Sequence, residues 1–190
     1  MGARLALLAA LLVVAGCSAP GQPAAPPFPG PPSFGPASFG PVDVMFAQMA
    51  LAQNQDGSQV AAVAATRSGD PRIRTIASTL RDRWKADSGT LQRWLLGWQQ
   101  PTTAPTGTHA GHGDLHALQP ADLVSLRAAS GAAFDRTAVA LLLGGLHNSV
   151  ETTRMESTGG DYPPARQLAT SMTSAYQEQI RALLIIAAQQ

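Results

Sequence analysis

Three histidines near the centre of the chain could bind a transition metal. His109, His112 and His116 lie in the segment "THAGHGDLHAL", with Asp114 among them. Imidazole is a common ligand of Cu(II), Zn(II) and Ni(II), and the i,i+4 spacing of His112 and His116 would place both rings on one face of a helix. The glycines of the segment also fit a plain loop in which histidine is tolerated. We favour the loop and keep a copper or zinc site as the alternative.

The single cysteine, Cys17, predicts a covalent lipid. It follows Arg4, an apolar run from Leu5 to Val14 and a few small residues, which is the layout of a secretory signal. The letters "VAGC" resemble the lipobox of bacterial lipoproteins, whose cysteine is acylated and becomes the first residue of the mature chain. The apolar run is too short to cross a bilayer as a helix. We expect residues 1–16 to be a signal peptide and Cys17 to anchor the exported protein to the outer face of the bacterial plasma membrane; a plain secreted protein with an incidental thiol is the alternative.

Five polar residues are expected near the interior of a helical bundle. They are Asn54, Asp87, His147, Glu151 and Gln179. Two carboxylates and one histidine could hold a divalent metal, but a ferritin-like di-iron site needs more carboxylates and a Glu-x-x-His spacing that this chain lacks. A hydrogen-bonded structural network is the interpretation that we favour.

The sequence offers no assembled catalytic site and no nucleic-acid surface. Ser125, Ser130 and Ser149 have no placed histidine and aspartate partners, and no phosphate-binding loop or zinc-protease motif occurs. The formal net charge is +1 and 13% of residues are charged, which gives no basic patch of the kind that binds nucleic acid. We expect a non-catalytic protein that contacts the membrane through the lipid on Cys17, with an envelope protein as a further candidate partner.

Helices are the elements expected to position these residues. More than half of residues 18–41 are proline or glycine, which excludes a helix or strand and predicts an extended tether. No later segment alternates with period two for long enough to form a strand, so the class is all-α. Gly144 and Gly145 predict a bend or a close helix crossing. The expected helices cover residues 42–66 with Asp43 as N-cap, 71–98 with Asp70 as N-cap, 120–129, a fourth run to about Met155, and 164–188.

An internal repeat of 92 residues divides the helical part in two. Residues that match at caps, breaks and apolar positions are Asp43 with Asp135, Pro71 with Pro163, and Trp84 with Tyr176. Two helical hairpins related in this way would cover each other's apolar stripe in a four-helix bundle, with a short extra helix at the central linker. The expected domains are a lipidated tether (17–41) and a bundle domain (42–190), which comprises repeat one (42–99), a linker (100–120) and repeat two (121–190).

Four motifs and one glutamate carry a family resemblance. They are "DVMFAQM" (43–49), "GDPRIRTIASTL" (69–80), "SGAAFDR" (130–136), "PPARQLATSM" (163–172) and Glu151. On these residues the chain resembles the bacterial family known as "domain of unknown function 305". The resemblance covers the chain after the tether and implies a ferritin-like bundle made from a duplicated hairpin.

The resemblance also implies a set of metal ligands that this chain largely lacks. Members of the family carry a His-His pair, followed by a glutamate, on the first helix of each repeat. The first pair falls here on Gln53 and Asn54, and the second falls on Gly145 and Leu146, so that only Glu151 remains. Amides are poor ligands for transition metals. We therefore expect a non-catalytic envelope lipoprotein that acts as a binding or interaction module, with copper or zinc homeostasis through the linker histidines as the alternative.

Overall fold

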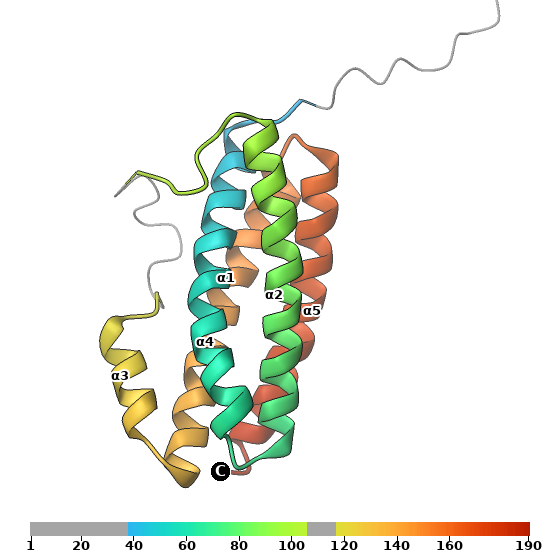
Figure 1. The fold of residues 1–190 in the computed structure, drawn as a ribbon. Coiled ribbons are helices and arrows are strands. Elements are labelled where there is room, and N and C mark those ends of the chain that lie inside the picture. The colour runs from blue at the N-terminus through green and yellow to red at the C-terminus, as the bar shows by residue number, and fades with distance from the viewer. Residues whose placement is uncertain (1–37, 106–116) are drawn as a thin grey trace, which may run out of the picture. The chain divides into compact units, whose positions relative to one another are not determined.

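The structure, a computed structural model, describes residues 38–105 and 117–190, which contain five helices (Figure 1). They are α1 (Pro41–Arg67), α2 (Pro71–Gly97), α3 (Pro120–Ala128), α4 (Gly131–Gly159) and α5 (Pro163–Ala187). No strand occurs in these two ranges, which confirms the all-α class. Cys17, His109, His112 and His116 lie outside the described residues, so the lipid anchor and the histidine metal site stay predictions.

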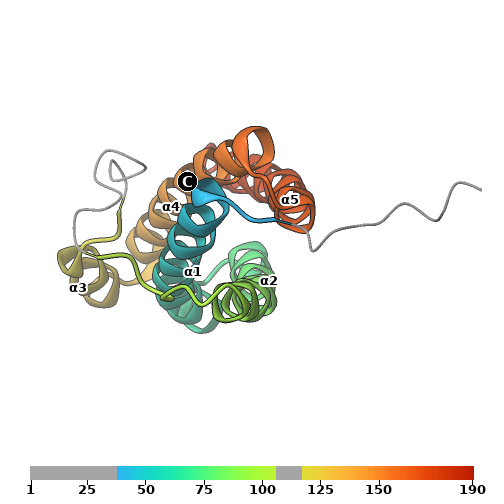
Figure 2. The ribbon, with the colours of Figure 1, turned by 90° about the horizontal axis from the view of Figure 1, so that it is seen from above.

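Four long helices form a bundle around one core. α1 packs against α2 and α4, α4 packs against α5, and the short α3 contacts α4 (Figure 2). The 92-residue spacing of the sequence repeat recurs in the helix bounds: it separates the ends of α1 and α4, at Arg67 and Gly159, and the starts of α2 and α5, at Pro71 and Pro163.

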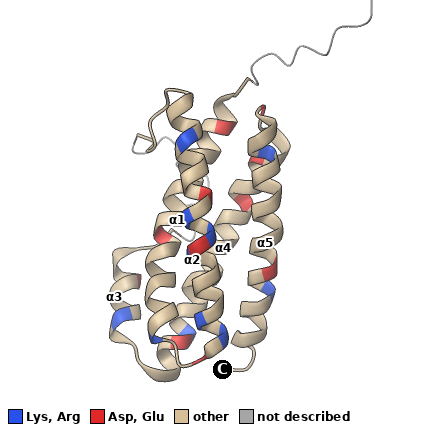
Figure 3. Cartoon of the chain, turned by 45° about the vertical axis from the view of Figure 1, so that its right-hand side comes forward, with Lys and Arg blue, Asp and Glu red and all other residues tan. Residues whose placement is uncertain are grey.

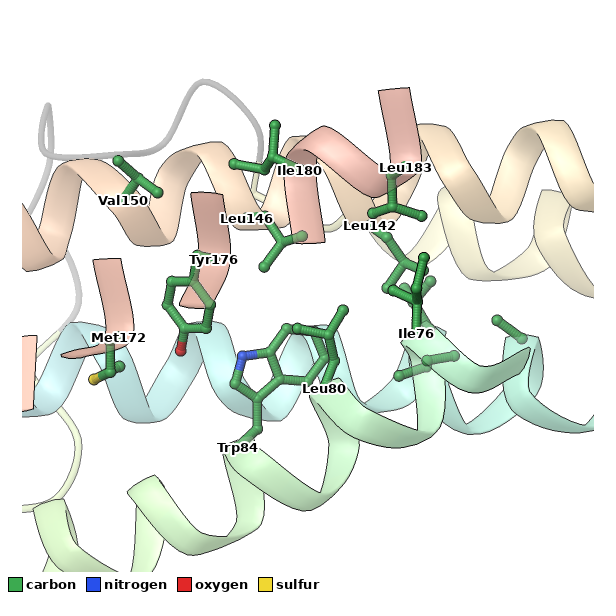
Figure 4. Packing of buried hydrophobic residues seen from close by; sticks show 14 of the residues in the cluster. Ile76, Leu80, Trp84, Leu142, Leu146, Val150, Met172, Tyr176, Ile180 and Leu183 are labelled. Atoms are coloured by element: carbon green, nitrogen blue, oxygen red, sulfur yellow. The ribbon is translucent and has the colours of Figure 1, made fainter. Parts of the chain in front are cut away.

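Large side chains fill the core between α2 and α5. Trp84 of α2 and Tyr176 of α5 point toward each other, with Met172 one turn away from the tyrosine (Figure 4). These two aromatic residues are also partners in the repeat. Across the same side of the bundle, Arg83 Nη2 donates a hydrogen bond to Ser171 Oγ at 3.1 Å. The space between α2 and α5 is therefore closed by side chains and not by close contact between the two backbones.

Two aspartates connect the helix pair α1–α2 with the helix pair α4–α5 by hydrogen bonds. Asp43 at the start of α1 accepts hydrogen bonds from the N–H groups of Asp161 and Tyr162, in the loop between α4 and α5, at 3.2 and 2.9 Å. Its counterpart in the repeat, Asp135 of α4, contacts the loop between α1 and α2, which consists of Ser68, Gly69 and Asp70. There it accepts from Ser68 Oγ at 2.6 Å and from Gly69 N–H at 3.2 Å. Because each aspartate binds a loop of the opposite pair, neither pair can move away without losing charge-assisted hydrogen bonds.

Some expected helix boundaries are wrong, as is a close helix crossing at Gly145. α1 begins one residue earlier than predicted, at Pro41, and its N-cap is Gly40, three residues before the expected Asp43. Asp43 lies at the third helical position and accepts a hydrogen bond from Gly40 N–H at 2.6 Å. α4 continues past Met155 to Gly159. The glycine pair marks no close crossing at Gly145, because a Cβ added there would meet no atom within 4 Å, and α4 passes through this residue as one helix.

Charged residues are mixed by sign over the bundle. Figure 3 shows Lys and Arg interspersed with Asp and Glu along the helices, and no face of one sign stands out in that view. Ion pairs form within single helices, as between Arg83 and Asp87 or between Arg154 and Glu151. In the part of the chain that the structure describes, no helix combines the length and the hydropathy that a membrane span requires.

Candidate functional site

A layer of polar side chains crosses the middle of the bundle at Gln53 and Asn54. Gln53 Nε2 donates a hydrogen bond to Thr152 Oγ1 of α4 at 2.9 Å. Asn54 is 2% exposed and donates from Nδ2 to Ser88 Oγ of α2 at 3.1 Å. Its Oδ1 accepts a longer hydrogen bond, 3.5 Å, from Tyr176 Oη of α5. Two neighbouring amides on α1 thus reach all three other helices of the bundle.

These contacts explain why a polar block can interrupt the packed face of α1. A buried amide costs free energy unless its donors and acceptors are paired. Asn54 is paired on both sides of its amide, whereas Gln53 pairs its nitrogen and leaves Oε1 buried without a hydrogen-bond partner among the described residues. A hydrogen-bonded network is present at the two positions where the family resemblance implies a histidine pair; of the five polar residues expected near the interior, it includes Asn54.

Asp87 points inward from α2, as its place in the apolar seam predicts. It is 8% exposed, and its Oδ2 lies 3.3 Å from Arg83 Nε. Burial raises the pKa of Asp87, and the Arg83 guanidinium partly opposes that rise. Burial, and then the charge of Asp87, also raise the pKa of Tyr176, so its hydroxyl stays a neutral donor. Gln179, the counterpart of Asp87 in the repeat, is half-buried.

The expectation that His147 and Glu151 lie inside the bundle is wrong. Both are exposed: His147 Nδ1 is 2.7 Å from the Leu143 carbonyl oxygen, and Glu151 forms an ion pair with Arg154 at 2.9 Å. The buried face of α4 advances in steps of four and three residues, and these steps pass over both positions. That face runs through Leu142, Leu146, Ser149, Thr153 and Glu156.

Glu156 is the buried acid that the sequence interpretation missed. Its side chain is 0% exposed, near the end of α4 and close to Asp43. The signal that could have found it is the apolar seam through Leu142 and Leu146, extended by the same steps toward the end of the helix. Within residues 38–105 and 117–190, no three His, Cys, Asp or Glu side chains converge as a metal site would require.

A groove of about 1110 Å³ opens beside the polar layer. Its walls come from α1, α2, α3 and α4 and from residues 102–104 and 117–119 of the linker. Polar lining residues include Gln53, Asn54, Gln55, Ser88, Gln92 and Asn148. Apolar lining residues include Met49, Leu118 and Leu141. The groove therefore offers amide and hydroxyl groups on an apolar base.

The groove carries polar groups that can bind a partner. Amides supply both donors and acceptors, which match neutral polar groups on a partner. Its charged lining residues are Asp56, Lys85 and Asp122, and burial raises the pKa of Asp56. The described lining contains no histidine or cysteine, so its serines have no histidine base beside them there.

Comparisons with known proteins agree with this architecture. The sequence profile of a family described as "Domain of unknown function (DUF305)" matches residues 43–186. The "putative secreted protein DUF305" of Streptomyces coelicolor has a similar structure, with a TM-score of 0.72 and 17% identity over 78% of this chain and 93% of that one. A DUF305 fragment from Deinococcus radiodurans gives a TM-score of 0.69 and 19% identity over 80% of this chain and 99% of the fragment.

A third similar structure is that of a copper-bound protein. CopM in its Cu(II)-bound form gives a TM-score of 0.67 and 20% identity, over 77% of this chain and 96% of CopM. CopM is also known in Cu(I)-bound and Ag-bound forms of similar fold. The sequence matched no curated protein. At such low identities the likeness to these structures shows the fold alone.

Proposed function

Because this chain belongs to the DUF305 family, whose description assigns no activity, we propose a function from the groove itself. The protein is an exported, non-catalytic lipoprotein, held at the outer face of the plasma membrane by the lipid on Cys17. Its bundle is a binding module, and the groove beside the polar layer is the surface that contacts a partner in the cell envelope.

The chemistry of the groove carries this proposal. Its amides lie on a bundle whose helices are locked to one another by Gln53 and Asn54, so the surface is presented without further ordering. Gln53 is one of the residues that line the groove, and its Oε1 is buried with no hydrogen-bond partner among the described residues. A buried acceptor without a partner costs about 1–3 kcal/mol, which a donor from a bound molecule or a water would recover.

The proposal has two further elements: export, which the N-terminal residues suggest, and a duplicated hairpin, which the repeat suggests. Export is supported by the signal-like residues 1–16 and by a solved relative whose name describes a secreted protein. We also propose that α1–α2 and α4–α5 are duplicated hairpins of a ferritin-like bundle. The repeat in the helix bounds and the reciprocal bonds of Asp43 and Asp135 support this duplication.

A site-specific cross-linking experiment tests the binding module. A photo-reactive amino acid replaces Gln55, an exposed groove residue, or Gln167, an exposed glutamine of α5 outside the groove. Irradiation of intact cells should give discrete adducts from position 55 and none from position 167. Identical adduct patterns from the two positions, or none from position 55, would contradict the proposal.

Copper or zinc handling is the second candidate function. It is supported by the three linker histidines and by the likeness to CopM, which is known in copper-bound and silver-bound forms. Residues 102–104 and 117–119 of the linker, which precede and follow the three histidines in the sequence, line the groove. In this alternative, His109, His112 and His116 would bind the metal.

Elemental analysis and calorimetry separate the two functions. The protein purified from its native envelope is analysed for copper and zinc, and the purified bundle is titrated with Cu(II) and Zn(II). Stoichiometric metal that is lost in the triple variant with alanine at positions 109, 112 and 116, but kept in His147→Ala, would establish the metal function. No binding by the parent protein would eliminate it.

A further inference from the structure

Asp43 lies at a junction of three parts of the chain. It is 0% exposed, and its carboxylate accepts hydrogen bonds from three backbone N–H groups: Gly40 at 2.6 Å, Tyr162 at 2.9 Å and Asp161 at 3.2 Å. Gly40 precedes α1, and the other two residues belong to the loop between α4 and α5. This carboxylate therefore ties the start of the bundle to a loop more than a hundred residues later.

Glu156 brings a second buried carboxyl group to the same junction. It is 0% exposed, and neither of its oxygens has an N–H or O–H donor among the described residues. Gly160 leaves room for it, because a Cβ at that position would collide with the Glu156 carboxyl group. The Glu156 and Asp43 side chains interact with each other. Two carboxylates cannot form a hydrogen bond with each other unless one of them holds a proton, so a protonated Glu156 would donate to Asp43.

The charges around Glu156 agree with this placement of the proton. Burial, followed by the hydrogen bond and the charge of Asp43, raises the pKa of Glu156 to about 8; Arg166 of α5 opposes the rise and Asp161 adds to it. For Asp43, burial acts to raise the pKa, but its three backbone donors and Glu156 outweigh burial and lower it. Near neutral pH the pair therefore carries one proton and one negative charge.

The corresponding junction at Asp135 has no counterpart of Glu156. Asp135 accepts hydrogen bonds from Ser68 and Gly69 in the loop between α1 and α2, much as Asp43 does from the loop between α4 and α5. The residue that corresponds to Glu156 in the first repeat, 92 positions earlier, is Ala64. A glutamate is thus not needed to fasten a loop of this kind. Its presence at only one of the two junctions makes that junction sensitive to protons.

The Asp43 junction also supports an aromatic cluster at the end of the bundle. Tyr162 meets Trp94 and Trp98 edge-on, with centroid distances of 5.5 and 5.3 Å. Phe39, the residue before Gly40, stacks on Trp98 at 4.7 Å. Both Phe39 and Tyr162 adjoin backbone groups that Asp43 holds, so loosening the junction would disturb the cluster.

We propose that Asp43 and Glu156 form a proton-operated clamp. While Glu156 keeps its proton, the clamp holds the start of α1, the loop between α4 and α5, and the aromatic cluster together. When the proton is lost, two buried negative charges face each other, and the loop and the residues before α1 open locally while the rest of the bundle stays folded. At alkaline pH, this end of the bundle would therefore expose the loop between α4 and α5 and the residues before α1.

Native-state hydrogen exchange tests the clamp against an internal control. The measured quantity is the exchange rate of the Asp161 amide divided by that of the Gly69 amide, which is held by Asp135 at the same distance, 3.2 Å. The ratio cancels the intrinsic pH dependence of exchange. If the clamp operates, the ratio rises by up to about 100-fold between pH 6 and pH 9 and levels off above about pH 8.

Two matched variants assign the effect to the buried acid. Glu156→Gln should make the ratio independent of pH, because the amide cannot ionise. Glu151→Gln, the same change at an exposed position of α4, should leave the rise unchanged. A parent protein whose ratio stays flat from pH 6 to pH 9 would overturn the proposal, as would a rise that survives in Glu156→Gln.

Discussion

Replacing Gly57 with alanine should destabilise the bundle, although alanine is the better helix former. Gly57 lies within α1 against the Trp84 ring, and a Cβ added to it would come within 2.6, 2.8 and 3.0 Å of three ring atoms. Trp84 is 3% exposed and fills the space toward α5, so it has little room to retreat. The close approach of a glycine lets the indole pack flat against the backbone of α1.

The expected magnitude follows from two opposing effects. Alanine in a helix interior is favoured over glycine by about 1 kcal/mol, whereas overpacking a full core costs about 1–3 kcal/mol. At Gly145 of α4 an added Cβ meets nothing within 4 Å, so only the favourable effect operates there. We expect Gly145→Ala to raise the free energy of unfolding by up to about 1 kcal/mol and Gly57→Ala to lie about 1–3 kcal/mol below it.

Urea unfolding followed by far-ultraviolet circular dichroism measures both variants under the same conditions. A third measurement places Gly57→Ala in a Trp84→Phe background, where the smaller ring should remove most of the penalty if the ring contact is its cause. Equal stabilisation by the two alanines would refute the argument. So would a penalty at position 57 that does not depend on the residue at position 84.

Further predictions concern pH, a helix end, the polar layer and the anchor. The folded-state pKa of Glu156, about 8, lies above its unfolded value near 4.5. The free energy of unfolding should therefore fall as the pH rises from about 5 to 8, by at most about 5 kcal/mol. In urea titrations, Glu156→Gln should flatten this pH dependence. Gln99 has a φ of 57° after the end of α2, so Gln99→Gly should raise the melting temperature, by the equivalent of about 0.5–1 kcal/mol. Asn54→Ala should cost about 1–3 kcal/mol in the same urea assay because it leaves buried polar groups unpaired, whereas the exposed Gln55→Ala should be nearly neutral. Cys17→Ala should move the protein from the membrane to the soluble fraction of lysed cells; an unchanged distribution would place the anchor elsewhere.

Local chemistry made some helix boundaries predictable and left others hidden. α2 begins as expected, because Asp70 accepts a hydrogen bond from the Arg72 N–H at 2.8 Å and Pro71 occupies the first helical position. The N-cap of α1 was placed three residues late, at Asp43 instead of Gly40, because Asp43 resembles an N-cap in sequence. Its carboxylate is instead shared with Asp161 and Tyr162, and a contact across more than a hundred residues leaves no local signal.

Periodicity was a better guide to the interior than family resemblance. The apolar seam of α2 predicts that Asp87 is buried, and it is. Glu151, which is also part of the family resemblance, was expected inside the bundle, yet it is exposed, while the apolar seam of α4 leads to Glu156. The groove could not be predicted, since it depends on how α4 is rotated against α1 and on the path of residues 102–104 and 117–119.

The repeat predicts the features in which the two halves agree, and the chemistry lies where they differ. Asp43 and Asp135 agree because each must fasten a loop of the other pair, so losing either would free a helix junction. Glu156 corresponds to Ala64, and Asn54 corresponds to Leu146, with a polar group in one half and an apolar side chain in the other. Such positions are not needed twice by the fold. They are therefore free to hold a buried proton at one end of the bundle and a layer of amides at its centre, and repeat symmetry alone gives no warning of either.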